Sequence, residues 1–255
     1  MSSYSTSAII LKRIDYGDYD LILSLITKEQ GKISAIAKYA KKSKKRFGGT
    51  LEHFSILNVT LKKGRENSLS ILEEALLIKC FSNVRSDMVK TAYAFYWTEI
   101  LNSWIKEGEK NEQVYELLNN TLVELNNGKI SSDLMNIFFH IRFLTLSGFL
   151  PELNSCGVCK RNVKYFQNNN ICFNIKDGFV VCESCKNNSS GSYLISKGII
   201  NMLLWINRDD FLRLSRINLT LSDMKNITGF LESFSIYHIG KEPKSLDFLK
   251  NIRNY

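Results

Sequence analysis

Four cysteines in two CxxC pairs are the residues whose types and spacing most clearly predict chemistry: Cys156, Cys159, Cys182 and Cys185. Each CxxC turn directs two sulfurs toward one point, so the four thiolates suit a single tetrahedral zinc ion. A site with four cysteine ligands leaves no coordination position open. We therefore expect a structural metal that stabilises the fold and does not activate water.

Alternatives to zinc stay open at this point. Disulfides are less expected, because the N-terminus carries no secretory signal that would direct the chain to an oxidising compartment. A redox CxxC or an iron–sulfur cluster would use the same ligand type. Cations flank the pairs at Lys160, Arg161 and Lys186 and would favour thiolates. Cys80 and Cys172 are expected to be buried free thiols.

The densest charge run lies at residues 38–46, where six of nine residues are cationic: Lys38, Lys41, Lys42, Lys44, Lys45 and Arg46. Tyr39 and Phe47 lie at its edges and are candidates for stacking on bases. Closely spaced cations match phosphate oxygens, and flat aromatic faces match unstacked bases. We expect Lys62, Lys63 and Arg65 to extend this surface. The simpler alternative is a solvated loop without a partner.

Composition supports a globular protein with a polyanionic partner. The net charge is +9, and residues 1–80 hold 14 Lys and Arg against 8 Asp and Glu. No apolar run approaches the length of a membrane span, so we expect a cytoplasmic protein without a membrane partner. The chain contains no phosphate-loop, zinc-protease or deaminase motif. We therefore predict neither an enzyme nor a nucleotide cofactor.

Hydrophobic periodicity predicts which elements position these residues. Residues 1–80 contain five β-rich runs separated by turn signals, at residues 5–14, 20–27, 32–38, 54–61 and 69–77. From about Asn83 the apolar spacing becomes helical, and the clearest helix begins at Ser131 or Ser132. The segment between the CxxC pairs contains a turn at residues 176–178, which favours a ribbon hairpin.

These elements predict an α+β multidomain protein. We expect an N-terminal OB-fold β-barrel at residues 1–80, which suits five strands. An α-helical domain would follow in two parts, at residues 81–151 and 191–255. A four-cysteine zinc ribbon would be inserted between them, at residues 152–190.

The order of these parts, with several local stretches, resembles the RecO family of bacterial recombination mediators. The similar stretches are residues 8–23, Thr27–Gly31, Lys41–Ser43, Leu51–Phe54, the two CxxC segments and residues 238–249. The resemblance covers nearly the whole chain.

The resemblance implies a DNA repair protein without enzymatic activity. It implies binding to single- and double-stranded DNA, annealing of complementary strands, and loading of RecA onto strands coated with single-strand-binding protein. The implied partners are RecR and the C-terminal tail of single-strand-binding protein, and the implied location is the bacterial nucleoid. The residues leave three alternatives. The first is an RNA-binding module, for which contacts to the 2′-hydroxyl would create a preference for RNA over DNA. The others are a zinc hydrolase, which needs an open metal position, and a scaffold that binds no nucleic acid.

Overall fold

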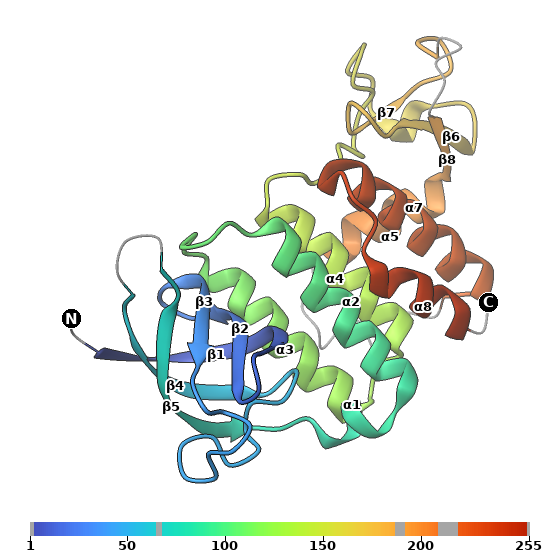
Figure 1. Ribbon diagram of the computed structural model, residues 1–255. Coiled ribbons are helices and arrows are strands. Elements are labelled where there is room, and N and C mark those ends of the chain that lie inside the picture. Colours follow the sequence, from blue (N-terminus) through green and yellow to red (C-terminus); the bar gives the residue numbers. More distant parts are fainter. Residues whose placement is uncertain (1–2, 65–67, 187–191, 209–218, 254–255) are drawn as a thin grey trace. The chain divides into compact units, whose positions relative to one another are not determined.

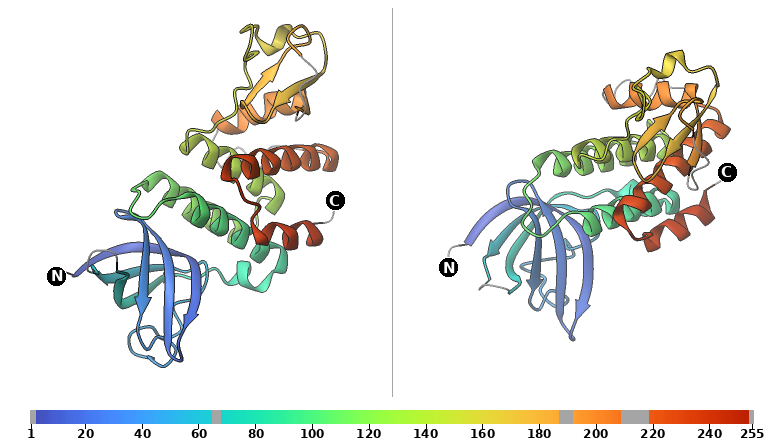
Figure 2. Two further views of the ribbon diagram at one scale, coloured as in Figure 1. Left: turned by 45° about the horizontal axis from the view of Figure 1, so that its top comes forward. Right: turned by 90° about the horizontal axis from the view of Figure 1, so that it is seen from above.

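Alternating apolar residues near the N-terminus form the five strands of a closed barrel, in the order β1-β2-β3-β5-β4 (Figure 1, Figure 2). The strands are β1 (Ser3–Tyr16), β2 (Asp20–Thr27), β3 (Gly31–Ala37), β4 (Ile56–Lys62) and β5 (Ser70–Lys79). All neighbours pair antiparallel except β3 and β5, which are parallel. The predicted five-stranded, OB-like barrel is confirmed.

The barrel core follows from the period of two along each strand. In β3, Ile33, Ala35 and Ala37 point inward and are buried, whereas the intervening residues are partly exposed. The connection from β3 to β4 adds Phe47 and Leu51 to the same core. This connection, which carries the basic run, therefore packs against the barrel.

The computed structural model describes residues 3–64, 68–186, 192–208 and 219–253, and the chain divides into two units. The first unit comprises residues 1–128 and 243–253. Its helices are α1 (Ser82–Ser86), α2 (Met88–Trp104), α3 (Glu112–Asn127) and α8 (Lys244–Ile252). None of the helices within the described ranges has the length and apolar character to cross a membrane.

The loop between α2 and α3 packs against the β2–β3 turn of the barrel. Gly31 adopts a positive φ of 71°, and a Cβ atom there would lie 2.0 Å from the carbonyl oxygen of Glu109. Lys32 Nζ donates to the carbonyl of Ile105 over 3.1 Å. The glycine allows the two backbones to approach, so the helices of the first unit are fastened to the barrel.

The second unit comprises residues 129–242 with the C-terminal residues 254–255. Its helices are α4 (Ser132–Leu146), α5 (Lys197–Arg208) and α7 (Leu221–Ile239), and α4 packs against both of the others. Ser131 caps α4 by accepting a hydrogen bond from the backbone of Leu134, as its sequence predicts.

A three-stranded antiparallel sheet, β7-β6-β8, forms the ribbon of the second unit. Its strands are β6 (Asn170–Asn174), β7 (Phe179–Val181) and β8 (Ser192–Ser196). The turn between β6 and β7 ends at Gly178, whose φ is +74°, as the predicted hairpin requires. Phe173 in β6 packs edge-on against Phe230 and Phe234 of α7, which joins the ribbon to the helices.

Candidate nucleic-acid interface and metal centre

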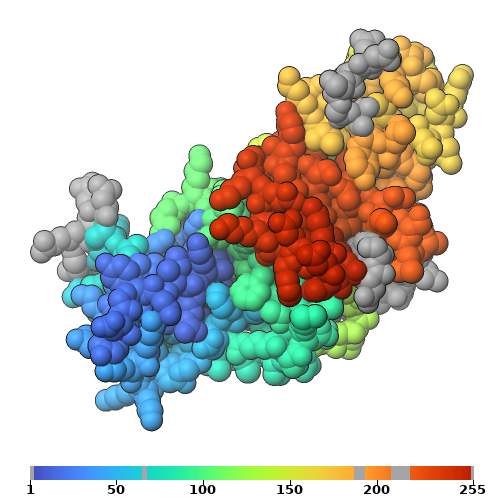
Figure 3. Space-filling model, turned by 45° about the vertical axis from the view of Figure 1, so that its right-hand side comes forward, coloured from blue at the N-terminus to red at the C-terminus, as the bar shows by residue number. Residues whose placement is uncertain are grey.

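The basic loop, defined here as residues 38–50, is held against the turn between β1 and β2. The backbone N–H of Tyr39, a residue with a φ of +57°, donates to Asp20 Oδ1 over 2.8 Å. The backbone N–H of Lys41 donates to the carbonyl of Tyr19 over 3.0 Å. Figure 3 shows the loop in light blue at the edge of the barrel surface. The loop is thus ordered by the barrel and presents its cations outward.

An exposed aromatic pair lies beside these cations. The rings of Tyr19 and Tyr39 stack, with centroids 5.9 Å apart and planes 8° from parallel. Lys42 Nζ lies 3.7 Å from the centre of the Tyr19 ring. Tyr39, predicted as a stacking residue, is 60% exposed. Tyr19 was missed by the sequence reasoning, although an aromatic residue next to the turn at Gly17 is a visible signal.

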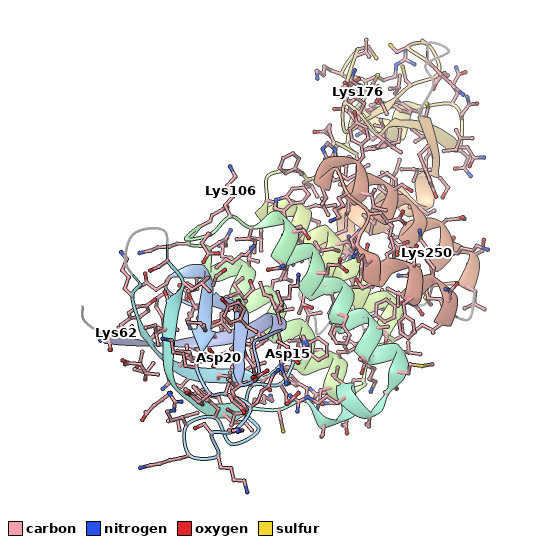
Figure 4. All side chains as sticks on the ribbon, in the orientation of Figure 1. Asp15, Asp20, Lys62, Lys106, Lys176 and Lys250 are labelled. Atoms are coloured by element: carbon pink, nitrogen blue, oxygen red, sulfur yellow. The ribbon has the colours of Figure 1, made fainter. Side chains whose placement is uncertain are left out.

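Most of the loop's positive charge is not neutralised within the protein. Lys41 pairs with Asp15 over 3.1 Å. Across the described residues, no carboxylate pairs with the other five cations, which are Lys38, Lys42, Lys44, Lys45 and Arg46. Figure 4 labels Asp15 and Asp20 at this end of the barrel. The loop therefore retains a dense positive charge for a polyanion.

Arg46 and Phe47 make contacts inside the loop and with the barrel core. Arg46 Nη2 donates to the carbonyl of Lys38 over 2.7 Å, and its guanidinium lies over the Phe47 ring. Phe47 is only 2% exposed and belongs to the barrel core. The expectation that Phe47 stacks on bases is therefore wrong, because burial in the core removes its faces from any ligand.

The second basic group lies apart from the loop. In the strand register, Lys62 of β4 lies opposite Ser3, at the start of β1. Asp20, which holds the loop through Tyr39, lies opposite Tyr16 at the other end of β1. Figure 4 shows Lys62 on another side of the barrel from Asp15 and Asp20. Lys63 follows Lys62 and is exposed, and Arg65 falls outside the described residues. The structure does not bring Lys62 and Lys63 together with the loop.

The four predicted metal ligands converge in the ribbon of the second unit. The sulfur atoms of Cys156, Cys159, Cys182 and Cys185 all lie within 4.8 Å of one another. The Sγ atoms of Cys159 and Cys182 are 3.6 Å apart. Four sulfurs at about 2.3 Å from a tetrahedral zinc ion are about 3.8 Å from each other. The four cysteines could thus hold one metal ion.

The backbone around the first CxxC pair suits a thiolate site. The backbone N–H of Cys182 points at Cys156 Sγ over 3.5 Å, and Lys160 turns the chain with a φ of +62°. Gly157 has no room for a side chain, since a Cβ atom would lie 2.1 Å from the Phe179 ring. The glycine lets the first CxxC turn pack on β7, next to the second pair.

The thiols of this cluster differ in acidity when no metal is bound. Burial raises the pKa of Cys156, but backbone N–H groups of Cys159, Cys182 and Val158 outweigh burial and lower that pKa to about 6. Hydrogen bonding to Cys182, followed by burial, raises the pKa of Cys185 to about 12. A bound cation would lower the pKa of both thiols, because it stabilises thiolates directly.

The two remaining cysteines are not part of this cluster. Cys172 is buried in β6, as expected. Cys80 is exposed, so the expectation of a buried thiol there is wrong. Cys80 directly follows β5, whose last residues are exposed at the barrel rim, and nothing in its sequence surroundings distinguishes it from a core thiol.

Comparison with known proteins places both regions in one family. Residues 1–81 match the model "Recombination protein O N terminal", and residues 85–247 match "Recombination protein O C terminal". The chain is 42% identical to "DNA repair protein RecO" of Desulfatibacillum aliphaticivorans, over 99% of this chain and 98% of the relative. It is 37% identical to "DNA repair protein RecO" of Desulfosudis oleivorans over the full length of both. The chain belongs to the RecO family of DNA repair proteins.

Proposed function

We propose that this protein is a non-enzymatic mediator of DNA repair and recombination that binds single- and double-stranded DNA through its basic loop. The observation that carries the proposal is the group of five loop cations without carboxylate partners among the described residues, beside an exposed tyrosine pair. Such a surface suits a phosphate backbone with unstacked bases. The names of its relatives, "DNA repair protein RecO", support DNA as the polyanion.

In this proposal Lys38, Lys41, Lys42, Lys44, Lys45 and Arg46 contact phosphates, and Tyr39 with Tyr19 stacks on bases. Lys62, Lys63 and Arg65 provide a separate, secondary contact. Two complementary strands repel each other until cations replace their counterions. A protein that lowers this repulsion promotes annealing without nucleotide hydrolysis.

The proposed partners follow from the family and the charge. We propose that the protein acts with RecR to load RecA onto strands coated by single-strand-binding protein, and that it contacts the acidic C-terminal tail of that protein. DNA as its main ligand would place it in the bacterial cytoplasm, at the nucleoid. None of these steps needs a catalytic group.

We propose zinc as the ion held by Cys156, Cys159, Cys182 and Cys185. Four thiolates suit zinc and fill its tetrahedral shell, so the ion would stabilise the ribbon and would activate no water. The converged sulfurs support this assignment. A structural metal is also consistent with a non-enzymatic role.

Annealing of complementary strands coated with single-strand-binding protein, without ATP, tests the proposal. The loop variant changes Lys41, Lys42, Lys44, Lys45 and Arg46 to Glu. A matched control changes five exposed lysines of the second unit to Glu: Lys129, Lys164, Lys176, Lys225 and Lys241. Both variants carry the same net charge, since five reversals subtract 10 from +9 and leave −1.

The proposal predicts annealing by the wild type and the control variant and loss of annealing in the loop variant. Annealing by all three proteins would move the DNA surface away from the loop. A wild type that anneals no DNA but binds RNA of the same sequence more tightly would favour the RNA-binding alternative.

A further inference from the structure

A pocket of about 250 Å³ opens between the basic loop and the barrel. Its floor is apolar and consists of Leu21, Ala40, Phe47 and Leu51. Lys41, Lys42 and Lys44 line its rim. The pocket therefore combines a hydrophobic base with a cationic mouth, and the wall between them carries further polar groups.

The wall of the pocket offers both a donor and an acceptor. Arg13 Nη1 lies 3.0 Å from Glu52 Oε1 and 3.5 Å from the carbonyl oxygen of Leu51. The Arg13 side chain is 28% exposed and that of Glu52 is 47% exposed, so both reach solvent at the pocket. A planar group with polar edges could exchange hydrogen bonds with this pair.

The shape and chemistry of the pocket fit a nucleobase better than a phosphate. An apolar cavity of about 150 Å³ accommodates benzene, so about 250 Å³ admits a larger planar ring. A phosphate would be held by the lysines of the rim, because on the apolar floor it would lose hydration without gaining donors there. A base offers apolar surface to the floor around Ala40 and polar edges to the wall.

Lys42 connects the pocket with the tyrosine pair. It lines the pocket, and its Nζ lies 3.7 Å from the centre of the Tyr19 ring. A base in the pocket and a neighbouring base on Tyr19 or Tyr39 would be joined by a phosphate near Lys42. Lys42 contacts both sites, so its charge could pair with that phosphate.

We propose that the pocket takes one unstacked base of a single strand, so that the loop distinguishes single strands from duplex by more than charge. This inference rests on the proposed function, since it assumes that the basic loop binds nucleic acid. Bases in a duplex are paired and stacked, so they cannot enter the pocket. The pocket residues thereby become determinants of strand specificity, and the loop cations supply affinity for both forms.

Fluorescence anisotropy with three probes of equal length tests this inference: a single strand of deoxythymidines, a single strand of abasic sites, and a duplex. The wild type should bind the thymidine strand about a hundredfold more tightly than the abasic strand, because the tyrosine stack and the pocket contact, about tenfold each, are both lost in the latter. Ala40→Leu fills the pocket from its floor. In this variant the ratio should fall to about tenfold, the part that the tyrosines supply.

A control separates the pocket from the tyrosines. The double variant Tyr19→Ala, Tyr39→Ala should retain part of the preference for bases, since the pocket remains open. A wild-type ratio near one would overturn the inference, as would a full ratio in a folded Ala40→Leu variant. If Ala40→Leu does not fold, loss of all base preference in the tyrosine variant overturns it.

Failure of the proposed function has a different signature. The loop charge-reversal variant should bind all three probes more weakly than the wild type. Unchanged affinity for the abasic strand in that variant would contradict the basic loop as the DNA surface. A base preference that falls in Ala40→Leu, together with weaker binding of all three probes in the loop variant, would support both proposals.

Discussion

The carboxylate of Glu99 in α2 caps the first turn of α8 through Ser245. Glu99 Oε2 accepts a hydrogen bond from the Ser245 backbone N–H over 2.9 Å and another from Ser245 Oγ over 2.5 Å. Glu99 Oε1 accepts from the Lys244 N–H over 3.0 Å. A negative charge at a helix N-terminus also interacts favourably with the helix dipole. These hydrogen bonds thus fix α8 to α2.

Replacing Glu99 by Ala should release α8 from α2. The variant leaves three donors at the start of α8 without this acceptor, but water can reach this exposed helix end. The net loss should therefore be near that of one hydrogen bond to a charged group, about 1.5–3 kcal/mol. We expect an unfolding free energy lower by about 2 kcal/mol and faster amide exchange in α8. Glu74→Ala, at an exposed position of β5, is the control and should change neither. Unaltered exchange in α8 of the Glu99 variant would contradict the capping role.

Loss of the proposed zinc ion should destabilise the second unit. Structural zinc in small sites contributes on the order of 10 kcal/mol, so Cys156→Ala should lower both the zinc content and the melting temperature of this unit. Cys172→Ala is the matched control, because this thiol is buried in the same ribbon but lies outside the ligand set. Metal analysis and calorimetry give the readouts. Equal zinc content in both variants would rule out the four-cysteine site.

Phe47 and Tyr39 lie in the same loop, but Phe47 should affect stability and Tyr39 should affect binding to single strands. Phe47→Ala opens a cavity in the barrel core and should lower the unfolding free energy by about 3–5 kcal/mol. Tyr39→Ala removes an exposed ring and should weaken binding to single strands by about tenfold, with a small effect on stability. Urea unfolding and anisotropy distinguish the two. A stable Phe47→Ala protein would show that the ring is not part of the core.

His53 should make the stability of the first unit depend on pH. Burial lowers the pKa of His53, and the nearby charge of Arg13 lowers it further. The unfolded chain, with a histidine pKa of about 6.5, then binds more protons than the folded chain. The contribution of neutral His53 to the unfolding free energy is therefore complete above a pH of about 6.5 and is lost as the pH falls. Urea midpoints at pH 7.5 and 5.5 should differ less in His53→Phe than in the wild type, and an equal difference would exclude His53 as the source.

The strands and the metal ligands could be predicted from the sequence because their signals are local. The alternation of Ile33, Ala35 and Ala37 with Lys32, Ser34 and Ile36 indicates which face of β3 is buried, because two of the three intervening residues are polar. Two CxxC turns bring their own sulfurs close, so only one long-range step joins Cys156 to Cys182. The density of lysines after β3 likewise predicts an exposed basic loop without knowledge of the barrel.

Contacts between distant segments could not be predicted in the same way. The apolar face of α8 does not specify α2 as its neighbour, and the acceptor on Glu99 lies about 145 positions earlier in the chain. The burial of Phe47 depends on how the loop folds back onto the barrel, whereas its neighbours Lys45 and Gly48 stay exposed. The pairing of β8 with β6 similarly adds a third strand to the ribbon from beyond the second CxxC pair.

The salt dependence of binding to single-stranded DNA tests whether the basic loop is the DNA surface. Six phosphate contacts predict a slope of about −4 in a plot of log affinity against log salt concentration. We expect this slope for the wild type and for the matched control with five reversed lysines in the second unit. The slope should be flatter by about 3.5 for the variant with Lys41, Lys42, Lys44, Lys45 and Arg46 changed to Glu. Equal slopes for the wild type and the loop variant would show that DNA does not bind at the basic loop.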